Sequence, residues 1–163
     1  RNRIARVTHA GVKAGSGSAG PVYLYHNTIW SRSPGAAGFV SEGAFEGLVS
    51  RNNLIVVPGV GWLVEADRAN DFDFDVVYAG EGVADWAGER HATLASWCAA
   101  AAQECSGLPA SEDVLNPDGG QWAPSAGEGH RDKAVPIAGI NDEFVGAGPD
   151  HGYLEAPAGA VGD

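Results

Sequence analysis

The sequence contains no methionine and only two lysines, Lys13 and Lys133. Because methionine is absent, the chain does not begin at a start codon, and we interpret it as a processed product or a fragment. No apolar run approaches the roughly 20 residues of a membrane-spanning helix, so no membrane span is expected. Ten lysines and arginines stand against 21 aspartates and glutamates, a net charge of −11. This balance argues against a nucleic-acid-binding surface, which needs a basic patch.

Glycine and proline are abundant, with 24 and 9 residues. Such a composition suits short strands joined by frequent turns better than long surface helices. Hydrophobic residues make up 44% of the chain, which is enough for a buried core. The excess of carboxylates attracts cations such as calcium. The composition therefore predicts a folded, turn-rich protein with an acidic surface.

A repeat runs through the first half of the chain. Residues 1–5, 26–30, 52–56 and 74–78 align without gaps, with Asn or Asp at the second position and Ile or Val at the fourth. The second positions are Asn2, Asn27, Asn53 and Asp75, which lie 25, 26 and 22 residues apart. A second marker, a glycine followed by an apolar residue, falls between these segments. It occurs at Gly11, Gly38, Gly61 and Gly82.

Two markers that keep the same order indicate the coils of a solenoid, in which each coil covers the apolar side of the next. Each coil would hold about three short strands, paired in parallel with those of the neighbouring coil. The fourth positions would then stack inside as an apolar ladder of Ile4, Ile29, Ile55 and Val77. The Asn positions tolerate left-handed backbone and hydrogen-bond to one another. We predict an all-β right-handed parallel β-helix of about four coils over residues 1–90.

The repeat fades after Tyr78. Residues 93–104 predict a helix that starts at the N-cap Thr93 and stops at Gly107, with Leu94, Trp97 and Ala101 facing the coil stack. We expect residues 91–155 to form this helix and an irregular capping segment, and residues 156–163 to be a flexible tail.

The two cysteines, Cys98 and Cys105, lie seven residues apart. They form either a local disulfide, which fits an oxidising compartment, or two free and partly buried thiols.

Several of these segments resemble one known family. Residues 22–29 resemble the "VYHNTI" coil of pectin-lyase-like right-handed parallel β-helix proteins, and residues 52–56 resemble their next coil, "NN(I/L)(F/I)V". Residues 137–146 and 149–155 resemble the closing "IPGIND-F-G" and "PDIGA-E" segments of the same proteins. The resemblance covers nearly the whole chain and implies the C-terminal coils and closing segment of such a fold. Its members include polysaccharide lyases, glycoside hydrolases, epimerases and proteins without known activity, so the fold does not by itself imply one reaction.

Glu65, Asp67 and Arg68 follow an apolar strand at residues 62–64 and are the candidate catalytic residues. Charges of both signs at a strand end suit a sugar groove. Paired carboxylates serve as acid and base in glycoside hydrolysis, and a basic side chain removes the proton in β-elimination. The alternative is a surface ion pair between Glu65 and Arg68, which contributes little stability.

Residues 71–75 alternate acidic and aromatic side chains. On a strand, Phe72 and Phe74 would face the core, and Asp71 and Asp73 would face outward, where carboxylates suit calcium, the one candidate cofactor. An EF-hand is excluded because Val76 stands where its loop needs glycine. The alternative is a solvated acidic edge. His26, beside the Asn ladder, is expected to be a structural hydrogen-bonding residue.

The resemblance implies a secreted or cell-surface β-helix that binds or cleaves polysaccharide, as a lyase or a glycoside hydrolase if it is an enzyme. The alternatives are a non-catalytic structural or adhesive β-helix, and one chain of a larger extracellular assembly. Residue 1 already lies within a coil, and an uncovered coil presents unpaired strand edges. We therefore expect upstream coils of the same protein, or another subunit, to cover the N-terminal face.

Overall fold

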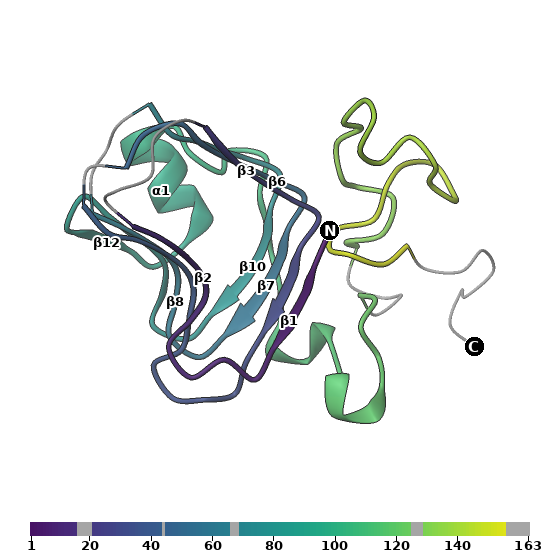
Figure 1. Cartoon of the computed structure of the whole chain (residues 1–163), viewed down its shortest axis with the longest axis horizontal. Coiled ribbons are helices and arrows are strands. Elements are labelled where there is room, and N and C mark those ends of the chain that lie inside the picture. The colour runs from purple at the N-terminus through teal and green to yellow at the C-terminus, as the bar shows by residue number, and fades with distance from the viewer. Residues whose placement is uncertain (16–20, 44, 66–68, 125–128, 156–163) are drawn as a thin grey trace.

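The chain forms a parallel β-solenoid with an irregular segment on one flank (Figure 1). The computed structural model describes residues 1–15, 21–43, 45–65, 69–124 and 129–155. The strands are β1 (Arg3–Ala5), β2 (Ala10–Ala14), β3 (Val22–Tyr25), β4 (Thr28–Trp30), β5 (Ala37–Ser41), β6 (Leu48–Arg51), β7 (Leu54–Val57), β8 (Val60–Val64), β9 (Asp71–Phe72), β10 (Val76–Ala79), β11 (Gly82–Trp86), β12 (Glu89–His91) and β13 (Leu108–Pro109). The predicted fold class is confirmed.

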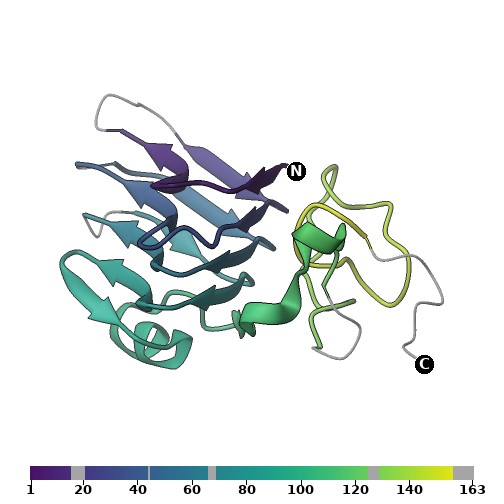
Figure 2. The ribbon, with the colours of Figure 1, turned by 90° about the horizontal axis from the view of Figure 1, so that it is seen from below.

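Equivalent strands of successive coils form three sheets, and the coils stack along one axis (Figure 2). Sheet A has the order β1-β4-β7-β10-β13, sheet B the order β12-β11-β8-β5-β2, and sheet C the order β3-β6-β9. Strands β1 to β9 make three complete coils. Strands β10 and β11 begin a fourth coil, but β12 then turns back antiparallel to β11. About three coils are therefore present where about four were predicted.

The predicted apolar ladder is confirmed by the register of sheet A. Ile4 pairs with Ile29, Ile29 with Ile55, and Ile55 with Val77. Ile29, Ile55 and Val77 are buried, and Ile4 packs against the same core from the first coil. One apolar side chain in each coil thus stacks on the equivalent side chain of the next.

The Asn positions form a hydrogen-bonded ladder between sheets C and A. The Asn2 amide donates to Asn27 at 2.9 Å, Asn27 to Asn53 at 2.8 Å, and Asn53 to the Asp75 carboxylate at 2.9 Å. The left-handed conformation, which Asn tolerates, is taken by the residues one position earlier and not by the ladder residues. These earlier residues are His26, Asn52 and Phe74, with φ of 52°, 62° and 60°. This turn precedes each ladder residue, whose side chain hydrogen-bonds to that of the next coil.

The glycine marker lies opposite the apolar ladder. A Cβ atom at Gly38 would lie 2.6 Å from Ile55 Cγ2 and 2.6 Å from the Gly61 carbonyl oxygen. Gly11, Gly38 and Gly61 are in register, but Gly82 pairs with Val60, so the predicted alignment of Gly82 with Gly61 is off by one residue. Glycine is needed here because the branched ladder side chains fill the space a Cβ would take.

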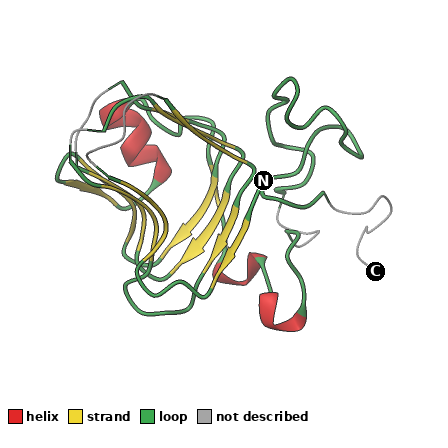
Figure 3. Cartoon of the chain, viewed as in Figure 1, coloured by secondary structure: helices red, strands yellow, loops and turns green. Residues whose placement is uncertain are grey.

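Aromatic side chains form a cluster within the core. Trp62 stacks on Phe72 with ring centroids 5.0 Å apart, and Phe72 contacts Trp86 and Trp97. Trp97 comes from helix α1 (Leu94–Ala101), which crosses the end of the coil stack (Figure 3). Leu94 and Trp97 are buried beneath the helix, as predicted.

The caps of helix α1 confirm one predicted boundary and correct the other. The Thr93 hydroxyl accepts a hydrogen bond from the Ser96 amide, so Thr93 is the N-cap as predicted. The helix ends at Ala101 because Ala102 takes a left-handed conformation, with φ of 52°, and the predicted stop at Gly107 was wrong. Cys98 and Cys105 form a disulfide, which decides between the two alternatives. It ties the helix to the loop that follows.

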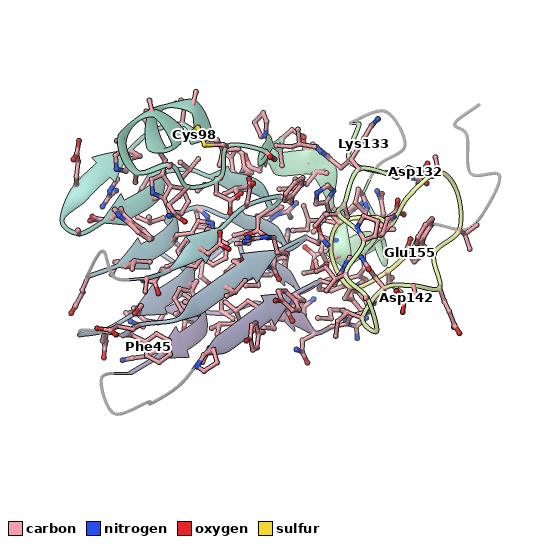
Figure 4. The ribbon with its side chains drawn as sticks, turned by 90° about the horizontal axis from the view of Figure 1, so that it is seen from above. Phe45, Cys98, Asp132, Lys133, Asp142 and Glu155 are labelled. Atoms are coloured by element: carbon pink, nitrogen blue, oxygen red, sulfur yellow. A yellow bond between two sulfur atoms is a disulfide. The ribbon has the colours of Figure 1, made fainter. Side chains whose placement is uncertain are left out.

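The irregular segment packs along the flank of sheet A. Two short 3-10 helices, η1 (Glu112–Val114) and η2 (Pro117–Gly119), are followed by residues 129–155, here called the strap. The labelled strap residues Asp132, Lys133, Asp142 and Glu155 lie on the side of the molecule away from Cys98 (Figure 4). The Gly152 amide donates to the Asn52 carbonyl at 2.8 Å, which ties the strap to the second and third coils. Helix α1 thus covers the end of the stack, and the strap covers a side.

Candidate functional site

A groove lies on the outer face of sheet B. The ribbon of this sheet curves toward the solenoid axis (Figure 1). The volume of the groove is about 340 Å³. The floor lies on a row of outward-facing residues that are paired from coil to coil, Lys13, Val40, Leu63 and Asp85, of which Val40 and Leu63 line the groove. Val40 and Leu63, at the centre of the row, give the floor an apolar surface. The groove therefore runs across the coils, along the axis of the solenoid.

Carboxylates line the rim of this groove. Glu42 follows β5 and Glu65 follows β8, at equivalent positions of successive coils. The Glu42 carboxylate lies 2.6 Å from the Lys13 ammonium group. The Glu65 carboxylate accepts a hydrogen bond from the Gly43 amide at 2.6 Å. Both carboxylates are therefore held in place by a neighbouring donor.

A basic side chain closes one end of the groove. Arg90, on the antiparallel strand β12, contacts the Asp85 carboxylate at 3.1 Å and the Glu81 carbonyl oxygen at 2.8 Å. His9 and Glu81 lie on the rim near the start of the sheet B strands. The groove thus presents an apolar floor between polar walls of mixed charge.

Of the three predicted catalytic residues, Glu65 lines this groove. Asp67 and Arg68 lie outside the residues that the structure describes. A role for Glu65 in catalysis stays a prediction, and its described contact is with the backbone amide of Gly43.

The two predicted calcium ligands, Asp71 and Asp73, make contacts with different groups. Asp71 forms an ion pair with Arg51 on the outer face of sheet C. Asp73 accepts hydrogen bonds from the amides of Phe74 and Ser106, at 3.0 Å and 2.6 Å. Within the described ranges, no group of three or more His, Cys, Asp or Glu side chains is placed to hold a metal ion.

The two phenylalanines of this segment differ in burial. Phe72 is buried in the aromatic core. Phe74 is only half-buried, because its left-handed backbone ends the alternation of the strand. The prediction that both rings face the core was wrong for Phe74.

A second pocket, of about 360 Å³, lies on the outer face of sheet A. Its walls are the side chains of Trp30, Val56, Pro58 and Tyr78, and its polar groups come from Arg32 and Glu112. The Tyr78 hydroxyl donates to the Glu112 carboxylate at 3.4 Å, and this carboxylate raises the pKa of Tyr78 above 10.0. The Arg32 guanidinium lies 5.4 Å from the centre of the Trp30 ring.

The sequence analysis missed this pocket, although one signal for it was present. The fifth position of the aligned repeat holds Trp30, Val56 and Tyr78, and the register places these three residues side by side on sheet A. Two aromatic residues in one outward row are a signal for a binding surface. Glu112 has no place in the repeat, so the sequence offered no signal for it.

His26 is structural, as predicted. Its Nε2 accepts hydrogen bonds from the Asn52 and Asn141 amides, at 3.0 Å and 2.6 Å, and its Nδ1 lies 3.2 Å from the Gly152 carbonyl oxygen. Burial is the largest cause that lowers the pKa of His26 to about 4, and the charge of Arg1 lowers it further. The neutral ring therefore joins the second coil to the strap.

A buried carboxyl pair ends the Asn ladder. Glu104 and Asp75 are 1% and 0% exposed, and the Asp75 amide donates to the Glu104 carboxylate at 3.1 Å. Burial raises the pKa of both groups, and the charge of Asp75 further raises the pKa of Glu104. The pair retains a proton because two adjacent buried carboxylates do not both ionise. Its enclosure gives it a role in stability.

Comparison with protein-family models, with curated proteins and with solved structures gives no match. The parallel solenoid itself rests on the strand pairing. No helix within the described residues is long and apolar enough to cross a membrane.

Proposed function

We propose that this protein binds a neutral polysaccharide in the groove on the outer face of sheet B and does not cleave it. The observation that carries the proposal is that the groove crosses successive coils between polar walls. Strands of adjacent coils lie about 4.8 Å apart. A polymer of similar units, lying along the axis, would meet equivalent side chains at each step.

The chemistry of the groove suits uncharged sugar rings. The C–H face of a sugar ring packs on an apolar floor such as Val40 and Leu63, while its hydroxyls reach the rim. The Glu42 and Glu65 carboxylates accept hydrogen bonds from hydroxyl groups. With a net charge of −11, the chain repels polyanions at long range. Neutral glycans are therefore favoured over acidic ones.

Binding is favoured over cleavage by the contacts of the two rim carboxylates. Glycoside hydrolysis needs a pair of carboxyl groups that flank the scissile bond and act on it. Here Glu42 is paired with Lys13, and Glu65 accepts a hydrogen bond from the Gly43 amide, so both carboxylates are already engaged by the protein. The pair is suited to orient hydroxyl groups.

The resemblance to pectin-lyase-like proteins supports the carbohydrate class, since relatives of this fold act on polysaccharides. The Cys98–Cys105 disulfide supports an oxidising compartment. We therefore propose that the protein is secreted or held at the cell surface.

Affinity electrophoresis in gels that contain neutral or uronate polysaccharides tests the function. Neutral polymers should retard the wild-type protein, and uronate polymers should not. Leu63→Asp, which places a carboxylate on the groove floor, should weaken retention at least about tenfold, a loss of about 1.4 kcal/mol. Val49→Asp is a matched control, because Val49 is a half-exposed apolar residue on the outer face of sheet C.

Release of reducing or unsaturated ends by the wild-type protein would contradict binding without cleavage. Equal retention of Leu63→Asp and the wild type would show that the groove is not the site. An absence of retention by every glycan would leave the structural or adhesive alternative.

A further inference from the structure

We propose that the pocket on sheet A binds one neutral sugar unit, which gives the chain a second carbohydrate site beside the groove of sheet B. This inference rests on the proposed function, because it extends the same ligand class to a separate surface. The pocket is built from three successive coils and from Glu112 of η1.

The size and walls of the pocket suit a single ring. A volume of about 360 Å³ lies at the lower end of the range for small-ligand sites. Val56 and the Trp30 ring are buried in the wall, whereas Tyr78 is half-exposed at the mouth. Aromatic and aliphatic walls pack against the C–H groups of a sugar ring.

The polar groups of the pocket are balanced in charge. The Glu112 carboxylate and the Tyr78 hydroxyl lie 3.4 Å apart. The Arg32 guanidinium is exposed and lies 3.3 Å from the Asp118 carboxylate. A cationic ligand would meet Arg32, and an anionic ligand would meet Glu112 and the net charge of the chain. A neutral ligand with several hydroxyls can use both the acidic and the basic group.

The pocket and the groove flank the same corner of the solenoid. Pro58 lines the pocket, and Val60, two residues later, lines the groove. Likewise, Gly80 lines the pocket, and the next residue, Glu81, lines the groove. The short turns between sheets A and B therefore separate the two surfaces. A single sugar in the pocket would place the rest of a glycan near the outer edge of the groove.

Saturation-transfer NMR with methyl glycosides of neutral hexoses tests the pocket on the full chain. Tyr78→Phe removes a hydroxyl, and Glu112→Gln replaces one acceptor oxygen with an NH2 donor at nearly the same shape, so each should weaken binding about tenfold. Tyr23→Phe on sheet C and Glu89→Gln on β12 are matched controls, since both residues are exposed. Circular dichroism checks that every variant is folded.

The outcomes separate this inference from the proposed function. If Leu63→Asp loses retention by polymer but keeps the methyl glycosides, the two sites are distinct and both proposals stand. If the wild type binds polymer but no methyl glycoside, or if Tyr78→Phe and Glu112→Gln bind as the wild type does, the pocket proposal is overturned alone. Binding of methyl glycosides without retention by any polymer overturns the groove alone. A preference for charged glycosides overturns the neutral ligand class.

Discussion

The main-chain amide of Asp75 donates a hydrogen bond to the carboxylate of Glu104 at 3.1 Å, and both residues are buried. This contact ends the ladder that begins at Asn2. The next residue, Cys105, is bonded to Cys98 of the helix. The disulfide, the helix and the last rung of the ladder therefore form one cap on the coil stack.

Stability should fall as the pH rises because of this pair. The pKa of Glu104 is raised well above its ordinary value of 4.5 in the folded protein, by burial first and then by the charge of Asp75. Its contribution to stability is therefore fully present below about 4.5 and is lost as the pH rises through the raised pKa. Glu104→Gln keeps an acceptor for the Asp75 amide and removes the second acid, so its unfolding free energy should change less as the pH rises above about 4.5.

Urea unfolding at several pH values measures this effect. Glu89→Gln, an exposed carboxylate on β12, serves as the control and should keep the pH dependence of the wild type. A Glu104→Gln variant with the same pH dependence as the wild type would show that the pair does not bind a proton on folding.

Acid should release the contact between His26 and the strap. The pKa of His26 is lowered from 6.5 to about 4 by burial first and by the charge of Arg1. The pKa is lower in the folded protein than in the unfolded chain because the fold favours the neutral ring. The stability that His26 contributes is therefore fully present above about pH 6.5 and is lost as the pH falls through about 4. The Asn52 and Asn141 amides both donate to Nε2, so a proton there would meet two donors.

Proton NMR of the imidazole ring gives the titration midpoint directly. A midpoint near 4, accompanied by loss of the Gly152 contacts, is expected. The exposed His9 provides an internal comparison. A His26 midpoint near 6.5 would contradict the buried hydrogen-bond arrangement.

Truncation of the apolar ladder should be costly. Ile29→Ala and Ile55→Ala remove buried side chains that are 2% and 0% exposed. Each should lower the free energy of unfolding by about 2–5 kcal/mol. Val49→Ala on the outer face of sheet C should cost much less. Urea midpoints measure the difference, and unchanged midpoints in both isoleucine variants would place these residues outside the core.

Adding a methyl group at Gly38 should destabilise the fold, because the neighbouring coil leaves no room for it. Its Cβ would lie 2.6 Å from both Ile55 Cγ2 and the Gly61 carbonyl oxygen. Gly38→Ala should therefore destabilise the protein by at least about 1–3 kcal/mol. Gly15→Ala is the matched control, because nothing lies within 4 Å of its added Cβ. Equal thermal midpoints for the two variants would contradict the close packing of coil on coil.

The repeat could be predicted from the sequence because each coil carries its own copy of the same local rule. Asn at the second position and Ile at the fourth recur at the coil spacing, and parallel pairing places them in register. The N-cap Thr93 was equally accessible, since capping depends on residues within one turn. The offset of Gly82 was not, because β11 is shifted by one residue against the marker of the earlier coils. The left-handed turn at Phe74 repeats those at His26 and Asn52, but these three residues share no side-chain type that would signal it.

The sequence by itself determined the solenoid, its apolar ladder and the helix that closes it, since these depend on periodic and local patterns. Only the tertiary structure decided which residues of the irregular segment contact the coils beside sheet A. Glu112 joins Tyr78 across 34 residues, and Asn141 joins His26 across 115. Such contacts are set by how an irregular segment folds back over the coils, and no local spacing encodes them. The groove of sheet B likewise depends on the bend of stacked strands, which brings side chains of separate coils onto one surface.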